Sequence, residues 1–278
     1  MLRERVSDDI YVFTSDLYIR VTAGAVVTPQ GAVLIDTLPI PIESHEMAEF
    51  LSHRCPAGVR YVILTHYHAD HTYGVYLYPD AKVVAHARCR DLLATKGEAA
   101  LQQAKQESPE LEEVSLRLPD LTLDKGEMEL YVGGKTLRLL WTPGHSEDLL
   151  SVFLEEDRVL FASDTLMSVP TIVDGDPEVL KESLRRLLEL KPENIVQGHG
   201  EVILRGEVQS VIESSIAYLD TIQELAEKAV REGKPREWLY QSDVESCGIS
   251  RVALDGRAQR LHVANLVTLY DRLKQSSG

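Results

Sequence analysis

The chain has 278 residues, of which 44% are hydrophobic, and its formal net charge is −15 at pH 7. This length allows one large domain, or one domain with an appendage, around a substantial core. The acidic balance argues against binding to nucleic acid, which needs a basic patch, and no apolar run approaches the length of a membrane span. We therefore expect a small-molecule substrate, no nucleic-acid partner and no membrane partner.

The first two thirds of the chain alternate between strand-like and helix-like stretches. Apolar runs bounded by turn residues predict strands over residues 10–13, 17–21, 24–27, 32–36, 59–64 and 82–85. Helical stretches are expected over residues 43–53 and 87–113, the second broken at Pro109. Two hairpins follow, made of residues 127–131 with 136–141 and residues 149–154 with 158–162. This order suggests two packed sheets with helices outside.

A cluster of ligand-type residues follows the predicted strand over 59–64. It reads His66-Tyr67-His68-Ala69-Asp70-His71 and places three imidazoles and one carboxylate within six residues. Both groups are good ligands for divalent metals. Partly buried polar groups need partners, and a metal ion would satisfy all four, so the cluster predicts a metal site.

Three later residues fit the same site. His145 ends Thr-Pro-Gly-His, Asp164 stands in Ser-Asp-Thr, and His199 stands in Gly-His-Gly, each after an apolar run. Taken singly, each would be read as a structural residue. Because each repeats the order of strand, turn and ligand-type residue, together with the earlier cluster they predict a site for two metal ions. The glycines beside His145 and His199 suit a backbone that bends closely around an ion.

The last part of the chain has a different character. Asp176 and Pro177 mark a helix start. Beyond residue 205, apolar residues recur at steps of three and four, which predicts a long amphipathic helix from residue 208 to about 229 and another over 258–273. We predict a catalytic domain over 1–205 and a C-terminal helical extension over 206–278. The extension is expected to pack on the catalytic domain, or to form a subunit contact in a homo-oligomer.

Cysteine usage points to a compartment. Cys55, Cys89 and Cys247 are odd in number and widely spaced, which disfavours a disulfide framework and fits a reducing environment. The first nine residues are charged and lack the apolar segment of a secretory signal. We expect a cytoplasmic protein.

These motifs together resemble those of the metallo-β-lactamase-fold hydrolase superfamily. The resemblance covers about residues 6–203 and includes Asp36 in Leu-Ile-Asp-Thr, the cluster over 66–71, and the motifs of His145, Asp164 and His199. It is specific for fold and metal site, and weakly specific for substrate. It implies an α+β fold, an αββα sandwich of two mixed sheets with outer helices.

The resemblance also implies a role for each motif residue. His66, His68 and His145 would hold one ion, Asp70, His71 and His199 would hold the second, and Asp164 would bridge them. A metal-bound hydroxide would be the nucleophile, available near neutral pH. Asp70 would also be catalytic by orienting this hydroxide, and Asp36 would fix the orientation of one histidine from outside the ligand set.

The residue at position 164 bears on metal and substrate. A carboxylate there fits zinc, the favoured metal, and also iron or manganese, whereas the true β-lactamases use a cysteine. Met167 stands where lactone-hydrolysing relatives tend to place a tyrosine, which disfavours a specific lactonase assignment. The chain also lacks the Gly-Cys-Gly-Arg segment of glyoxalase II and persulfide dioxygenases, which disfavours those two activities.

We predict a dinuclear metal-dependent hydrolase of a small ester, thioester, lactone or amide. Tyr67, Tyr73, Met167 and Val169 suit a partly apolar acyl or ring group. The first alternative is a mononuclear iron oxygenase, resembling the persulfide dioxygenases, on the same fold. A phosphodiesterase is disfavoured by the acidic charge. A non-enzymatic scaffold is disfavoured because it has no use for seven metal ligands.

Overall fold

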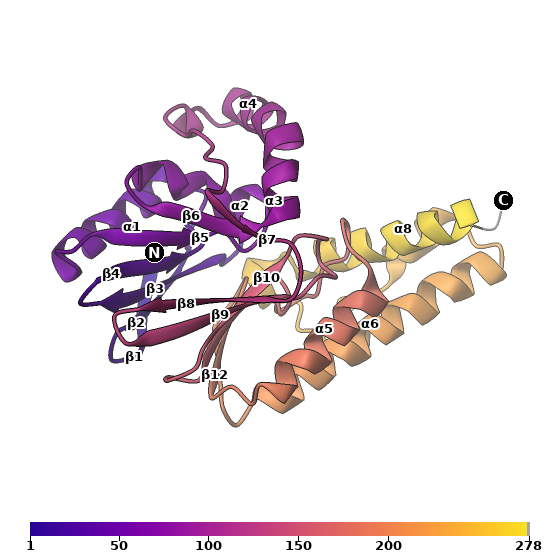
Figure 1. Cartoon of the computed structure of the whole chain (residues 1–278). Coiled ribbons are helices and arrows are strands. Elements are labelled where there is room, and N and C mark those ends of the chain that lie inside the picture. Colours follow the sequence, from indigo (N-terminus) through magenta and orange to yellow (C-terminus); the bar gives the residue numbers. More distant parts are fainter. Residues whose placement is uncertain (277–278) are drawn as a thin grey trace.

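The computed structural model describes residues 1–276, which form two facing sheets with helices on their outer sides (Figure 1). This confirms the predicted α+β sandwich. The first sheet has seven strands in chain order: β1 (Leu2–Ser7), β2 (Ile10–Thr14), β3 (Thr22–Thr28), β4 (Gly31–Ile35), β5 (Val59–Ile63), β6 (Lys82–His86) and β7 (Leu121–Leu123). Strands β1 to β4 pair antiparallel and β4 to β7 pair parallel, so the sheet is mixed.

The second sheet has six strands in the order β13-β12-β11-β10-β9-β8. They are β8 (Glu127–Val132), β9 (Lys135–Trp141), β10 (Leu150–Leu154), β11 (Val159–Ser163), β12 (Asn194–Gln197) and β13 (Val202–Leu204). Only the β11–β12 pair among them is parallel, so this sheet is also mixed. The two predicted hairpins are confirmed as β8–β9 and β10–β11.

Apolar side chains from both sheets fill the layer between them. Ile63 of the first sheet and Leu139 and Phe161 of the second lie in one buried cluster. At Gly24 the sheets approach so closely that a Cβ atom would lie 2.1 Å from the Phe161 ring. This position therefore admits no side chain without repacking of the layer.

Helices cover the outer face of the first sheet and form a lobe beside it. Helix α1 (Pro41–Arg54) buries Met47 and Leu51 against that face. After β6, the chain forms the lobe from α3 (Ala87–Leu92), the π-helical turn η2 (Leu93–Gly97), α4 (Glu98–Glu107) and η3 (Pro109–Leu111). The predicted helical stretch over 87–113 is thus present, and it breaks before Pro109 as expected.

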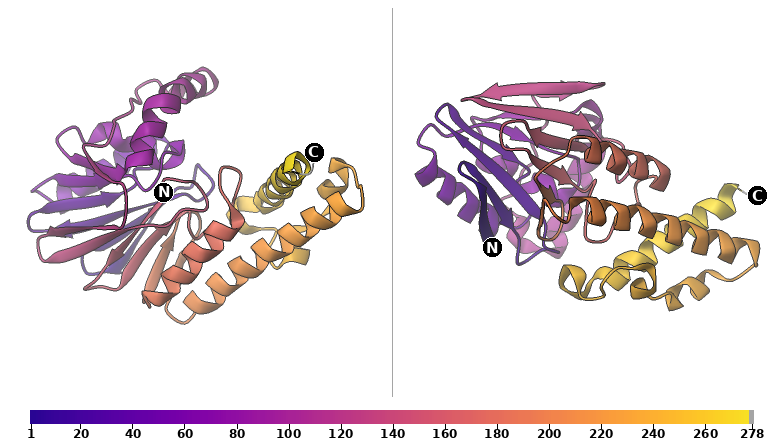
Figure 2. Two further views of the ribbon diagram at one scale, coloured as in Figure 1. Left: turned by 45° about the vertical axis from the view of Figure 1, so that its right-hand side comes forward. Right: turned by 90° about the horizontal axis from the view of Figure 1, so that it is seen from below.

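The C-terminal helices share a core with the second sheet. Buried residues of β10 and β11 lie in one cluster with residues of α5 (Pro177–Glu189), α6 (Val208–Arg231) and α8 (Ala258–Ser276). Helices α6 and α8 lie side by side, and their far ends extend beyond the sheets (Figure 2). Between them run η4 (Arg236–Gln241), η5 (Val244–Cys247) and α7 (Ala253–Gly256). The predicted extension is therefore helical and packs on the sandwich, while a contact with a second subunit stays a prediction.

The region near the N-terminus differs from the sequence analysis in one predicted strand and in one strand that was not predicted. Residues 17–21 are predicted as a strand, but residues 17–20 form a turn, in which Ile19 and Arg20 have positive φ angles of 43° and 56°, and Val21 makes an isolated β-bridge with His199. The Ser15 hydroxyl closes this turn by accepting hydrogen bonds from the amides of Leu17 and Tyr18. Strand β1 was not predicted, because half of its residues are charged and none is buried.

Two expectations from the sequence concern disulfides and membrane spans. Cys55, Cys89 and Cys247 are buried free thiols. Within residues 1–276, no helix combines the length and the apolar character needed to cross a bilayer.

Candidate metal centre

The predicted ligands lie in segments that follow strands of both sheets, with Asp70 and His71 in the short helix α2 (Ala69–Thr72). His66 and His68 follow β5, Asp164 follows β11, and His199 follows β12. His145 follows β9, in the loop that leads to β10. Because each segment is anchored by a strand of one of the two sheets, residues far apart in the sequence converge at one place.

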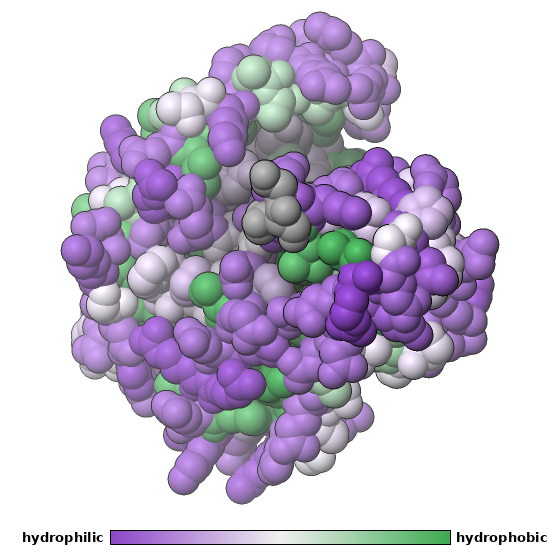
Figure 3. Space-filling model, turned by 90° about the vertical axis from the view of Figure 1, so that its right-hand side faces the viewer, coloured by the Kyte–Doolittle hydropathy of each residue, from purple (hydrophilic) through white to green (hydrophobic). Residues whose placement is uncertain are grey.

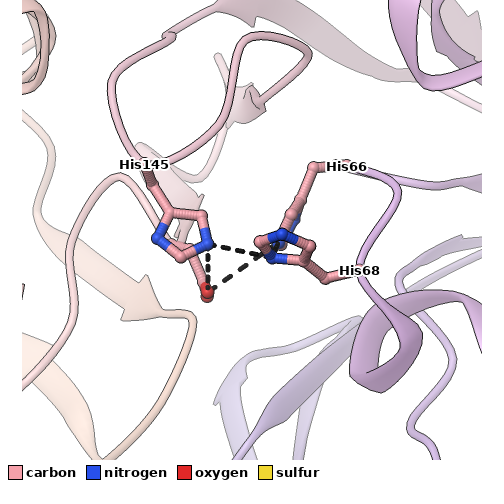
Figure 4. Close-up of side chains that lie close together, drawn as sticks. His66, His68 and His145 are labelled. Carbon is pink, nitrogen blue, oxygen red and sulfur yellow. Dashed lines mark hydrogen bonds and ion pairs between the residues drawn. The ribbon is translucent and has the colours of Figure 1, made fainter. Parts of the chain in front are cut away.

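The first group contains four of the predicted ligands. His66, His68, His145 and Asp164 each offer one atom, and these atoms all lie within 4.8 Å of one another. Nδ1 of His68 lies 2.9 Å from Nε2 of His66 and 3.0 Å from Nε2 of His145. The three imidazoles therefore aim nitrogen atoms at a common point (Figure 4).

The second group lies directly beside the first. Asp70, His71 and His199 offer atoms that also lie within 4.8 Å of one another. Oδ2 of Asp70 lies 3.2 Å from Nε2 of His199 and 3.8 Å from Nε2 of His71. The structure thus brings together all seven predicted ligands in the two groups that the resemblance implied.

Asp164 faces both groups, one with each carboxylate oxygen. Its Oδ2 atom lies 3.2 Å from Nε2 of His145 and 3.8 Å from Nε2 of His66. Its Oδ1 atom lies 3.3 Å from Nε2 of His71 and 3.7 Å from Nε2 of His199. This is the arrangement needed of a carboxylate that bridges two ions.

Two buried atoms show that the donor set fits a cation. Nε2 of His71 and Oδ1 of Asp164 are buried and face each other at 3.3 Å, but neither makes a hydrogen bond. A buried polar atom without a partner is costly, and a divalent ion between these two atoms would satisfy both. The absence of a side chain at Gly198 leaves room for the Asp164 carboxylate, since a Cβ atom there would lie 1.9 Å from Oδ1 of Asp164.

The electrostatics of the first group suit metal binding. Burial lowers the pKa of His66 well below its ordinary value and lowers that of His145 to about 4. Burial opposes the charge on Asp164, but the adjacent histidines, His199 first, outweigh it and hold its pKa well below the usual range. Neutral imidazoles beside an ionised carboxylate are the protonation states that a divalent metal requires.

The second group is more negative. Burial would lower the pKa of His71, but the charges of Asp164, Asp36 and Asp70 outweigh it and raise that pKa well above its ordinary value. Burial also opposes a positive charge on His199, and the carboxylates of Asp164 and Asp70 again raise its pKa. A concentration of buried carboxylate charge at this position suits a cation.

Asp36, to which the resemblance assigns the orientation of one histidine, lies against His71. Its Oδ2 atom accepts a hydrogen bond of 2.8 Å from Nδ1 of His71, and its carboxylate also binds the amide and hydroxyl of Thr65 at 2.8 Å. Asp36 has a positive φ of 60°, and Ser163, directly before Asp164, has 47°. Strained backbone of this kind tends to occur at functional sites.

Three other residues that orient histidines were not predicted. Nδ1 of His145 lies 3.0 Å from the carbonyl oxygen of Thr171, and Nδ1 of His199 lies 2.9 Å from that of Ile19. Nε2 of His68 lies 3.0 Å from Oδ2 of Asp174. All three partners lie in irregular segments without a motif, so the sequence carries no signal for them.

The C-terminal helix α8 holds the segment that carries two of these partners. The Asn265 side chain accepts a hydrogen bond from the amide of Ile172 and donates one to the carbonyl of Pro170. The Arg272 guanidinium donates to the carbonyls of Val173 and Gly175. Residues 170–175 therefore lie between α8 and the histidines of the first group.

The aromatic and apolar residues named from the sequence divide into two places. Tyr67 and Tyr73 line a cavity beside His68. Met167 instead lines a separate cavity against α6, and Val169 is buried in the core of the C-terminal helices. Only the two tyrosines therefore lie where a substrate group next to the ligands would contact them.

Comparison with known proteins agrees with the geometry. A family model described as the metallo-beta-lactamase superfamily matches residues 19–199. A metallo-beta-lactamase family protein of Thermus thermophilus superposes with a TM-score of 0.71 at 20% identity, covering 98% of this chain and 95% of that one. This similarity is one of fold, and it includes the C-terminal helices.

Curated relatives match at the sequence level over about two thirds of the chain. A beta-lactamase-like protein 2 homolog of Caenorhabditis elegans is 27% identical, covering 67% of this chain and 56% of the relative. A hydroxyacylglutathione hydrolase of Rhodopseudomonas palustris is 28% identical, covering 63% and 61%. An atrochrysone carboxyl ACP thioesterase of Claviceps purpurea is 27% identical, covering 66% and 52%. The matches thus span little more than half the length of these relatives.

Proposed function

The chain belongs to the metallo-beta-lactamase superfamily, and on that premise we propose that it is a dinuclear metal-dependent hydrolase of a small carboxylic-acid derivative. The observation that carries the proposal is the position of Asp164, which offers one oxygen to each group of histidines. A site for one ion would have no need of a carboxylate placed between two ligand sets.

The residues that would hold the ions are the seven described above. His66, His68 and His145 would hold one ion, Asp70, His71 and His199 the other, and Asp164 both. Bound ions would supply Lewis acidity and bring the pKa of a bound water near 7. Zinc is the proposed metal because imidazole and carboxylate ligands suit it, and the same set also accommodates iron or manganese.

Asp70 is the proposed catalytic residue of the chain itself. Burial opposes its ionisation, but the charges of His71 and His199 outweigh this and lower its pKa, so Asp70 is a carboxylate at neutral pH. A carboxylate there can accept a hydrogen bond from the attacking water and thereby orient it. It can then hold the proton until the leaving group takes it.

We favour attack at a carbonyl carbon, and within that class a thioester or ester. Two relatives are named as a hydroxyacylglutathione hydrolase and an acyl carrier protein thioesterase, and both names describe the cleavage of an acyl thioester. The chain lacks the Gly-Cys-Gly-Arg segment of glyoxalase II, so the proposal does not extend to glutathione as the thiol. The net charge of −15 makes an anionic polymer a poor substrate.

A metal-defined substrate screen tests the proposal. Metal-free protein is reloaded with zinc, manganese or iron and assayed on ester, thioester, lactone, β-lactam and phosphodiester substrates, with oxygen uptake recorded alongside. We expect two ions per chain, turnover of thioesters or esters, and no oxygen uptake. One tightly bound iron with oxygen uptake would support the oxygenase, and phosphodiester turnover above all carbonyl substrates would overturn the assignment.

A further inference from the structure

An apolar cavity of about 170 Å³ adjoins the metal centre. His68 belongs both to the wall of this cavity and to the first ligand group. Tyr67 lies beside it, with the two ring centroids 4.6 Å apart. A substrate held at the ligands could therefore extend one end into the cavity.

The opposite wall comes from the helical lobe after β6. Leu93, Lys96 and Gly97 line it, and all three belong to the π-helical turn η2. Seen from the C-terminal side, the surface is hollowed between this lobe and the C-terminal helices (Figure 3). π-Helical turns are rare and occur frequently at functional sites, so the wall is built from a specialised part of the fold.

The lining presents mainly apolar surface, and the side chains of Tyr67 and His68 direct polar atoms to a residue outside it. The Tyr67 hydroxyl and Nε2 of His68 both lie 3.0 Å from Oδ2 of Asp174. Leu93 and Leu116 supply aliphatic side chains. The Lys96 ammonium lies 5.8 Å from the centroid of the Tyr67 ring, a cation–π position at the exposed edge.

We propose that this cavity receives the acyl group of the substrate. The inference rests on the proposed function, since it requires a carbonyl substrate whose reacting carbon lies at the ligands. An apolar cavity of about 150 Å³ in another protein holds one benzene molecule, so the matching acyl group is a phenylacyl group or a chain of roughly four to six carbons. Longer chains would have to leave the cavity for solvent.

A series of acyl thioesters tests this size limit. N-Acetylcysteamine thioesters from acetyl to dodecanoyl are assayed with the metal-loaded protein by release of the free thiol. Burial of each added methylene predicts a rise in kcat/KM of about fourfold up to the hexanoyl substrate. Beyond hexanoyl, kcat/KM should stop rising.

Two variants test which wall sets the limit. Ala100 lines the cavity, and a leucine there would fill space that two or more methylenes of the substrate would occupy. Ala100→Leu should therefore lower the hexanoyl-to-acetyl ratio of kcat/KM by about tenfold or more. Leu116→Ala enlarges the cavity and should move the optimum to a longer chain. Ala99→Leu is the matched control, because Ala99 is an exposed neighbour on α4 that does not line the cavity.

The outcomes separate this inference from the function on which it rests. Thioester turnover with a flat chain-length series, or an equal response of Ala100→Leu and Ala99→Leu, would overturn the acyl site and leave the hydrolase proposal intact. The absence of turnover on every ester and thioester, with two ions bound, would overturn both.

Discussion

Gly198 shows how a single residue sets the distance between a ligand and its neighbours. A Cβ atom at this position would lie 1.9 Å from Oδ1 of Asp164, so Gly198→Ala should displace the carboxylate that faces both groups. Substitutions outside the ligand set that disturb the orientation of a ligand typically cost about 10- to 100-fold in metal affinity. We expect metal analysis after dialysis to give fewer than two ions per chain.

A second glycine supplies the control for this prediction. A Cβ atom at Gly206 would have no other heavy atom within 4 Å, and the backbone there has no left-handed angle. Gly206→Ala should therefore keep the metal content of the unmodified protein. If Gly198→Ala also retained two ions with unchanged affinity, Asp164 would not be the bridging residue.

Asp70 can be tested by a change that keeps its size. Asp70→Asn removes the charge next to His199 and His71, and we expect kcat to fall by about 10²- to 10⁴-fold, the usual worth of a positioned base. The assay is run in excess metal, because the substitution also weakens the second group. The control is Asp80→Asn, at an exposed position away from the ligands. Turnover within a few fold of the unmodified protein would exclude the proposed role.

At the scale of elements, the ligand loops were predictable and the turn beside them was not. Each ligand lies in a motif that follows a strand with an apolar run, so local sequence specifies both the element and the residue. Residues 17–21 have an equally apolar appearance, but the Ser15 hydroxyl binds two amides ahead of it and folds the chain into a turn. Such local side-chain bonds compete with strand pairing.

This turn also contributes to the site, which explains why the strand pattern fails there. The carbonyl of Ile19 binds Nδ1 of His199, and the carbonyl of Arg20 accepts from the amide of Gly200. Contacts of this kind join segments about 180 residues apart in the sequence. The sequence pattern cannot specify these contacts, because Ile19 and Arg20 lie outside any motif. The same is true of the contact between Asp174 and His68, since Asp174 also lies outside any motif.

Removal of the Ser15 hydroxyl tests the turn as an element. Ser15→Ala leaves the amides of Leu17 and Tyr18 without their partner and removes the 2.5 Å hydrogen bond to buried Glu43. Leaving buried polar groups unsatisfied costs about 1–3 kcal/mol, so the free energy of unfolding from urea denaturation should fall by about that amount. Ser52→Ala is the control, since its hydroxyl binds only a carbonyl on the exposed face of α1. Equal effects of the two substitutions would contradict a special role for the turn.

At the scale of the whole molecule, the C-terminal helix and the metal centre are parts of one structure. Helix α8 binds residues 170–175 through Arg272, and Asp174 in that segment contacts His68. The predicted division at residue 205 separates the ligands from the extension in the sequence. The hydrogen bonds nevertheless connect the extension to the first ligand group.

This connection predicts that a change on α8 weakens metal binding. Arg272→Ala removes the guanidinium bonds to Val173 and Gly175 and should loosen the segment that orients His68 and His145. We expect the zinc affinity to fall by about 10- to 100-fold. Competition with a chromophoric chelator measures this change. The control Arg260→Ala changes an exposed arginine of the same helix and should leave zinc affinity unchanged.

The same connection must appear in the stability of the protein, because coupling between two parts of a molecule is reciprocal. Zinc at about 1,000 times its dissociation constant stabilises the folded state by about 4.1 kcal/mol. A loss of 10- to 100-fold in affinity removes about 1.4 to 2.7 kcal/mol of that stabilisation at the same zinc concentration. Adding zinc to metal-free protein should therefore raise the unfolding temperature of Arg272→Ala by less than it raises that of the unmodified chain or of Arg260→Ala. Equal increases in all three proteins, measured by calorimetry at equal zinc concentration, would show that α8 packs on the sandwich without acting on the metal centre.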